Sequence, residues 1–163
     1  MSNPALLTRM LAIVAFGLLT ALTVLSIGWL QPGGLRIFDS RLLGYDVADA
    51  QTYIDSLTPA ARGLYLGVFR VLDTLFPVFA SAAMIGAVLV GKGRAWVPAL
   101  AIPVAFLALD LTENALVGQM LREGPALAET ASRITMAKWG SFFTGLLLAL
   151  AAWRARHRKG DDR

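Results

Sequence analysis

Residues 6–30, LLTRMLAIVAFGLLTALTVLSIGWL, form an apolar run that contains a single charge, Arg9. A helix needs roughly 20 apolar residues to cross the ~30 Å hydrocarbon core of a bilayer, so this run predicts a membrane span. A cleaved signal peptide is the alternative interpretation. The run is longer than a typical signal-peptide core and no small-x-small site closes it, so we expect a retained span.

Three further apolar runs follow, at about 60–90, 95–120 and 134–153. Across the chain of 163 residues, 56% are apolar and only 16% are charged, which is far from the composition of an ordinary soluble domain. We therefore predict an all-α fold in a single membrane domain over residues 1–163. It is a bundle of four transmembrane helices with a short amphipathic helix in the first outer loop, residues 31–59.

The pattern from Asp46 to Leu57 predicts that short helix. Asp46 stands at a capping position and Asp49 follows three residues later, which is the spacing of a capping box. The apolar residues recur at helical spacing: Val47, Ala50, Tyr53, Ile54 and Leu57. The sequence leaves open whether this helix covers the outer mouth of the bundle or only connects two spans.

Basic residues predict the orientation, because Lys and Arg concentrate in cytoplasmic flanks. The flanks on the side of the two termini carry Arg9, Lys92, Arg94, Arg154, Arg156, Arg158, Lys159 and Arg163. The other two loops are less basic and hold most of the acids. We therefore predict a multi-pass protein of the bacterial inner membrane with both termini in the cytoplasm. The basic tail, residues 154–163, is expected to contact anionic lipid rather than nucleic acid.

Ionisable residues inside the spans are the informative feature. A charge at mid-bilayer costs at least ~2.5–3.5 kcal/mol, so such residues are paired, hydrated or functional. Asp110, Glu113 and Asn114 share one helix face, and Arg70 and Asp73 are three residues apart on another helix. The charged residues inside the spans all fall at nearly one depth in the membrane. The candidates for a ligand or proton site are Arg70, Asp73, Asp110, Glu113, Asn114 and Lys138.

The charges of this set do not balance, because three carboxylates face two cations. We therefore expect one of Asp73, Asp110 and Glu113 to keep or share a proton, unless a bound cation supplies the missing charge. Three interpretations stay open. The set holds the helices together, binds a ligand or proton, or pairs with a partner subunit in a homodimer or larger complex.

Several chemistries lack their residues. The chain has no cysteine and only one histidine, His157, in the basic tail. Thiol chemistry, haem or di-iron ligation and a Ser-His pair are therefore excluded, and we predict no metal and no cofactor. The expected function is that of a non-enzymatic binding, structural or accessory membrane protein. The alternative is a transporter for a proton, a cation or a small amphiphile, or a membrane enzyme that uses the carboxylates.

Four short motifs add a resemblance to a known group. They are Gly44-Tyr45, Asp73-x-x-x-Pro77, Asp110-x-x-Glu113-Asn114 and the lone Lys138. Together, over roughly residues 44–145, the chain resembles a group of bacterial four-helix integral membrane proteins of uncharacterised activity. The resemblance implies a four-helix fold with a shared polar cluster, and it implies no activity.

Overall fold

All regular structure is helical in residues 3–92 and 94–161, which this computed structural model describes. Four long, apolar stretches can cross a membrane: Pro4–Leu30, Pro59–Gly91, Trp96–Glu123 and Pro125–Arg156. Their main helices are α1 (Pro4–Leu25), α4 (Arg70–Lys92), α5 (Ala101–Glu123) and α6 (Ala128–Asp161). The predicted all-α, four-span membrane bundle is confirmed.

Short helical turns lengthen or join these helices. A π-helical turn, η1 (Ser26–Leu30), continues α1, and α3 (Pro59–Leu64) with η4 (Tyr65–Phe69) leads into α4. The turns η5 (Arg94–Leu100) and η6 (Pro125–Leu127) precede α5 and α6. The helix α6 extends well beyond the predicted span 134–153. Hydropathy finds the lipid-embedded part of a helix but not its polar ends. Much of the predicted lipid-binding tail lies outside the described part of the structure, which leaves out the side chains of residues 157–163.

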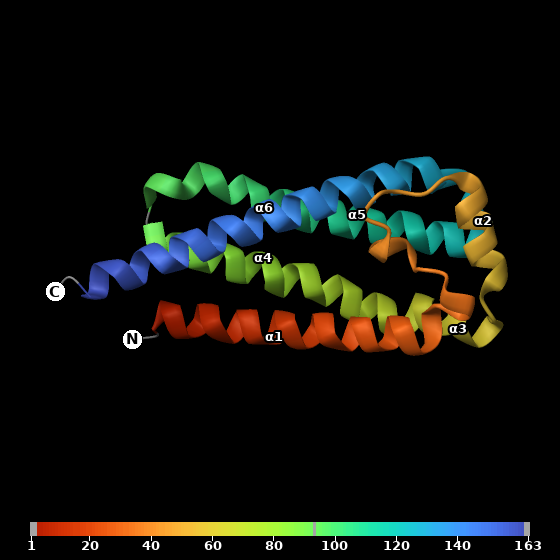
Figure 1. The fold of residues 1–163 in the computed structure, drawn as a ribbon, viewed down its shortest axis with the longest axis horizontal. Helices are drawn as coiled ribbons and strands as arrows, with labels where there is room; N and C mark the ends of the chain where they lie inside the picture. The colour runs from red at the N-terminus through yellow and green to blue at the C-terminus, as the bar shows by residue number, and fades with distance from the viewer. Residues whose placement is uncertain (1–2, 93, 162–163) are drawn as a thin grey trace.

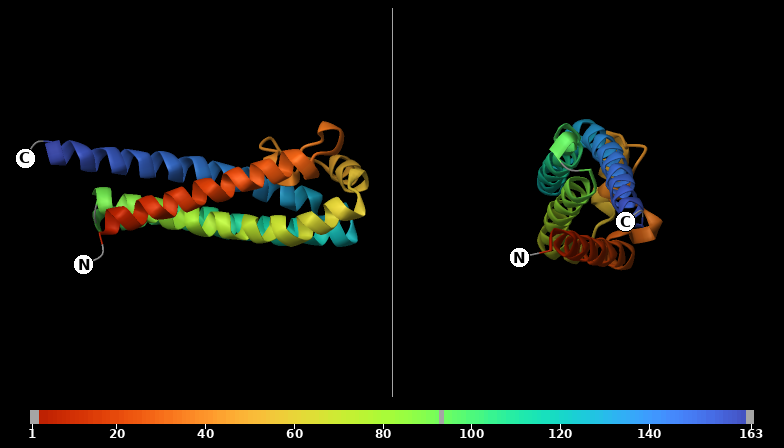
Figure 2. Two further views of the ribbon diagram at one scale, coloured as in Figure 1. Left: turned by 90° about the horizontal axis from the view of Figure 1, so that it is seen from below. Right: turned by 90° about the vertical axis from the view of Figure 1, so that its left-hand side faces the viewer.

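The two termini lie at one end of the bundle, and α2 (Val47–Ser56) lies across the other, here called the loop end (Figure 1). The helix α4 packs against α1, α5 and α6, and α5 also packs against α6. In the end-on view, α1 lies at the edge of the bundle beside α4, with α5 on the far side (Figure 2). The helix α4 is therefore the central element, and α1 is peripheral.

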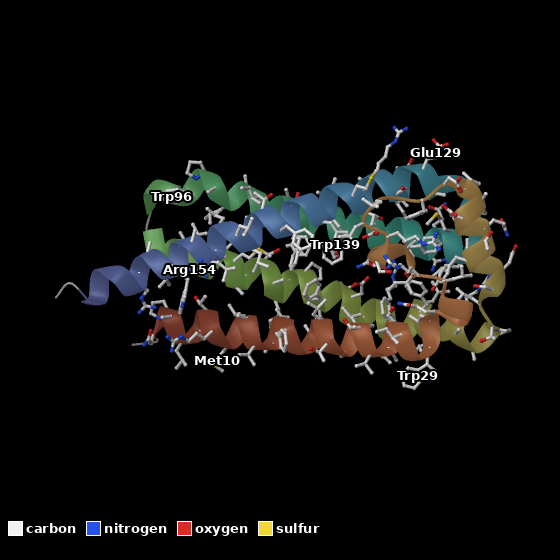
Figure 3. The ribbon with its side chains drawn as sticks, viewed as in Figure 1. Met10, Trp29, Trp96, Glu129, Trp139 and Arg154 are labelled. Carbon is white, nitrogen blue, oxygen red and sulfur yellow. The ribbon has the colours of Figure 1, made fainter. Side chains whose placement is uncertain are left out.

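Large apolar side chains on the outer faces are exposed in the isolated chain. Met10 of α1 and Trp29 of η1, for example, project away from the other helices (Figure 3) and are 56% and 60% exposed. A soluble domain does not present such a surface along its whole length. The lipid bilayer therefore covers these faces.

The predicted amphipathic helix is present as α2. The Asp49 backbone N–H donates to Asp46 Oδ1 at 2.7 Å and the reciprocal bond completes a capping box. Ala50, Tyr53 and Ile54 are buried against the protein. The Tyr53 hydroxyl donates to the Leu30 carbonyl at 2.8 Å, so α2 is tied to the end of the first span. Its apolar face therefore closes the loop end of the bundle.

Close helix packing near the termini gives a first testable prediction. A Cβ built on Gly91 of α4 would overlap the Ala152 backbone of α6, which no rotamer change can relieve. Gly91→Ala is therefore expected to cost about 1–3 kcal/mol of stability. Gly140→Ala on α6 is the matched control, because a Cβ there has nothing within 4 Å. Thermal unfolding in lipid nanodiscs should show the loss in G91A and no loss in G140A; equal midpoints would refute the close approach.

Candidate functional site

Lys138 of α6 is the centre of a buried ion cluster. Its side chain contacts three carboxylates, and Lys138 is only 3% exposed. The ammonium lies 2.7 Å from Asp39 Oδ1 and 3.0 Å from Asp110 Oδ1, and it also pairs with Glu113 Oε2. The carboxylates come from the loop before α2 and from α5. The cluster therefore joins α5, α6 and a loop at one point.

Asp39 reaches this cluster from a re-entrant segment, defined here as residues 31–46. In Figure 1 the segment, in orange, turns back from the loop end along the bundle before it reaches α2. Lys138 lies ten residues into α6, so the segment penetrates ~15 Å from the start of that helix. Irregular backbone is tolerated at membrane depth only where protein or a water-filled cavity surrounds it. Phe38 and Asp39 are accordingly buried.

Three side chains besides those of the segment hold Asp39 in place. Lys138 donates to its Oδ1, the Tyr65 hydroxyl donates to its Oδ2 at 2.9 Å, and Trp139 Nε1 donates to its backbone carbonyl at 2.7 Å. Burial is the largest single influence and opposes ionisation. The charge of Lys138 and the hydrogen bonds from Lys138 and Tyr65 together outweigh it, and the pKa of Asp39 is lowered. Asp39 is therefore an ionised anchor.

Asp39→Asn is expected to lower the free energy of unfolding at pH 7 by about 1.5–3 kcal/mol, because the amide loses the charge that binds Lys138. Folding lowers the pKa of Asp39, so the stability that its carboxylate contributes is fully present above the ordinary carboxyl pKa. This stability is lost as the pH falls through the pKa of the folded state. The gap between wild type and variant should therefore close below about pH 4. Unfolding of both proteins in nanodiscs over a range of pH measures this difference in stability. Asp55→Asn, exposed on α2, is the control, and a gap that persists at low pH would contradict the assignment.

Asp73 of α4 is buried beside this cluster but is not paired. It is 5% exposed, and its Oδ2 has no hydrogen-bond partner in the described residues. Asn114 donates to the backbone carbonyl of Asp73 and to Asp110 Oδ2, each at 3.3 Å, and so makes no bond to the Asp73 carboxylate. A buried carboxylate oxygen without a donor is costly and calls for an explanation.

Glu113 and Thr135 complete the polar contacts. Glu113 is fully buried, its Oε1 accepts from the Thr135 hydroxyl, and its Oε2 faces Lys138. The Ala131 carbonyl, 3.0 Å from the same hydroxyl oxygen, is a second acceptor within reach of its single proton. The helix α6 thus presents Thr135 and Lys138, three residues apart, on the face toward α5.

Arg70 does not join the cluster, although it was predicted beside Asp73. Its guanidinium lies against Gly118 of α5, where an added Cβ would overlap it. It borders a crevice with Asp73 and Asn114 but forms no ion pair in the described part of the chain. The structure therefore brings together five of the six predicted residues: Asp73, Asp110, Glu113, Asn114 and Lys138.

The structure adds Asp39, which the sequence analysis assigned only to the outer loop. The charge balance changes accordingly. Four buried carboxyl groups, those of Asp39, Asp73, Asp110 and Glu113, now surround one ammonium, Lys138. No local signal identifies Asp39. It follows the apolar pair Ile37-Phe38, but the same loop also contains the apolar pair Leu42-Leu43, of which Leu43 is 97% exposed.

A cavity of about 220 Å³ lies next to the cluster. This is far above the ~10–15 Å³ that admits one water molecule. Its polar lining comes from Asp39, Asp73, Asp110 and Lys138, together with Thr23, Ser26, Gln31 and Ser40. Trp139 and apolar side chains of α1, α4, α5 and the adjoining turns and loop form the rest. Figure 3 shows Trp139 on the side of α6 toward α4, about midway along the bundle. The cavity can hold water or a small polar group against Asp73.

No group of three or more His, Asp or Glu side chains in the described ranges is arranged to hold a metal ion. The reason lies in the cluster, because the Lys138 ammonium occupies the point on which three carboxylates converge. No family model, no curated protein and no solved structure matches the chain.

Proposed function

We propose that this four-span protein is a non-enzymatic membrane protein that binds a small ligand with a hydrogen-bond-donating, cationic head group in the cavity beside Lys138. The observation that carries the proposal is Asp73 Oδ2. It is buried, it has no donor among the described residues, and Asp73 lines the cavity. A ligand that donates to this oxygen removes the cost of leaving it unpaired.

The charge of the site selects the class of ligand. Four carboxyl groups against one ammonium would leave a formal charge of −3 if all were ionised, so the cluster retains protons or attracts a cation. An ammonium group supplies both a positive charge and donors. A phosphate or carboxylate head would add to the surplus of negative charge, and we expect the site to reject it.

The geometry favours binding over proton or cation transport. A transporter needs polar groups along a path between the two faces of the membrane. A second space lies between the cavity and the end of the bundle that carries the termini. It is bordered by apolar side chains, with Thr8 and Arg9 near its far end. Asp39, Asp110 and Glu113 are each engaged by Lys138, and Asp73 alone is left free for a ligand.

The cellular setting is part of the proposal. The excess of Lys and Arg on the terminal side supports cytoplasmic termini in a bacterial inner membrane, which places the ligand cavity in the outer half of the bilayer. Contact of the basic tail with anionic lipid, the absence of nucleic acid as a partner, and assembly into a homodimer or larger complex stay predictions.

Hexylammonium is the probe that tests the head-group assignment, with hexanoate as the same chain of opposite charge. Wild type in nanodiscs should unfold at a higher temperature with hexylammonium, by mass action on the folded state, and should not respond to hexanoate. Asp73→Asn should abolish the response and fold at least as stably as wild type, because it removes an unpaired buried acid. Asp55→Asn should respond as wild type. An equal response to both probes, or an undiminished response in D73N, would reject the proposal.

A further inference from the structure

An apolar groove runs along the side of the bundle between α1 and α6, with α4 as its floor. Its volume is about 580 Å³. The helix α1 packs mainly against α4, and side chains of α1 and of α6 line opposite walls of the groove. The walls carry large and small apolar side chains, among them Ile13, Phe16, Ala83, Met84, Leu146 and Leu150.

The groove adjoins the polar cavity. Leu19 of α1 and Phe76 of α4 border both spaces. The two spaces therefore lie next to each other across these two side chains, with the carboxyl groups in the cavity and hydrocarbon surface in the groove. This is the distribution of polarity in a single-chain amphiphile, which has a polar head on an apolar tail.

Side chains bound the groove and the adjoining cavity, taken together, at both ends. Near the termini, the Arg9 guanidinium of α1 lies 5.4 Å from the ring centroid of Trp153 on α6. At the other end, Asp39 of the re-entrant segment pairs with Lys138. The length between Lys138 and Trp153 is ~22 Å along α6, which is shorter than the ~30 Å hydrocarbon core. A partner helix would have to leave through both ends, whereas a lipid chain ends inside the membrane.

We propose that the groove holds the hydrocarbon chain of a single-chain amphiphile with an amine head, which enters sideways from the bilayer between α1 and α6. The chain lies on α4, and the ammonium group reaches Asp73 in the cavity. This inference rests on the proposed function for its head group. The groove adds the tail, the route of entry and the membrane as the source of the ligand.

Octadecylamine, butylamine and octadecanoic acid are the probes. The key variant is Ala83→Phe, because Ala83 lines the groove away from the carboxyl groups and phenylalanine would fill it. Ala115→Phe, at an exposed position on α5, is the matched control. Binding is measured by native mass spectrometry of the full chain in nanodiscs at fixed mole fraction of the long-chain probe, so that partition into lipid is equal for all variants.

We expect A83F to bind octadecylamine at least about tenfold more weakly than wild type and A115F to bind it normally. A83F should still bind butylamine, which also shows that the variant is folded. Asp73→Asn should weaken both amines, and octadecanoic acid should bind poorly to every form.

Other results would overturn the inference in distinguishable ways. If both amines need Asp73 but A83F binds octadecylamine normally, the groove assignment fails and the head-group site stands. If neither amine binds, the proposed function fails with it. If octadecanoic acid binds as well as octadecylamine, the groove takes a chain without the proposed head. If wild type is a dimer that A83F dissociates, the occupant is a second copy.

Discussion

Lys138→Met is expected to destabilise the protein by about 3–5 kcal/mol, the cost typical of removing one partner from a buried ion pair. The methionine fills similar space, so the loss reports charge rather than volume. Asp39, Asp110 and Glu113 would remain at the centre of the bundle with no cation among them. The re-entrant segment would lose its main electrostatic tie to α6.

Unfolding of K138M in nanodiscs, with Arg133→Met at an exposed position on the same helix as control, measures this loss. Because Asp110 is one of the carboxylates left unpaired, the double variant K138M/D110N should recover part of the stability lost in K138M. A K138M protein within about 0.5 kcal/mol of wild type would show that the contacts of Lys138 are not structural.

Gly44→Ala is expected to cost about 2–4 kcal/mol, from backbone strain together with a lost hydrogen bond. Gly44 has a φ of +86°, and a Cβ there would lie 2.8 Å from the Ser132 hydroxyl oxygen of α6. That oxygen accepts a 2.8 Å hydrogen bond from the Tyr45 backbone N–H. The substitution would therefore push the end of the re-entrant segment away from α6.

Gly34→Ala is the control for Gly44→Ala, because it isolates the contribution of the positive φ. Gly34 has a φ of +81° in the same segment, but nothing lies within 4 Å of its Cβ position. G34A should therefore lose only the strain energy, about 1–3 kcal/mol. The difference between the unfolding free energies of G44A and G34A gives the contribution of the Ser132 contact. If G34A and G44A lose equal stability, that contact does not anchor the segment.

The four spans could be predicted because the bilayer demands long apolar helices that satisfy their own backbone. The helix α2 could be predicted because a capping box and an amphipathic face act locally. Asp110, Glu113, Asn114 and Lys138 were found by the same logic, since a polar residue at membrane depth needs a partner.

Asp39 could not be predicted, because its depth depends on how a loop folds back between helices. No local pattern shows that a polar loop re-enters the membrane, and the contacts that hold Asp39 come from Tyr65, Lys138 and Trp139, all distant in sequence.

Arg70 lies outside the contacts of Lys138, and its role in a ligand site stays a prediction. Asp73 lines both the cavity and the crevice beside Gly118, whereas Arg70 borders the crevice. Residues three apart on a helix differ by roughly 60° in direction, so the two side chains share a face without pointing the same way.

We propose that exchangeable protons or the cationic head of a ligand balance the surplus of carboxyl groups around Lys138. The most direct test is calorimetric titration of hexylammonium into the wild-type protein at pH 7, in buffers of different ionisation enthalpy, which counts protons exchanged on binding. If the ammonium replaces a proton held by the cluster, as the proposed function requires, we expect a net release of protons on binding, and neither binding nor release in Asp73→Asn. Binding with no proton release, or with proton uptake, would contradict it.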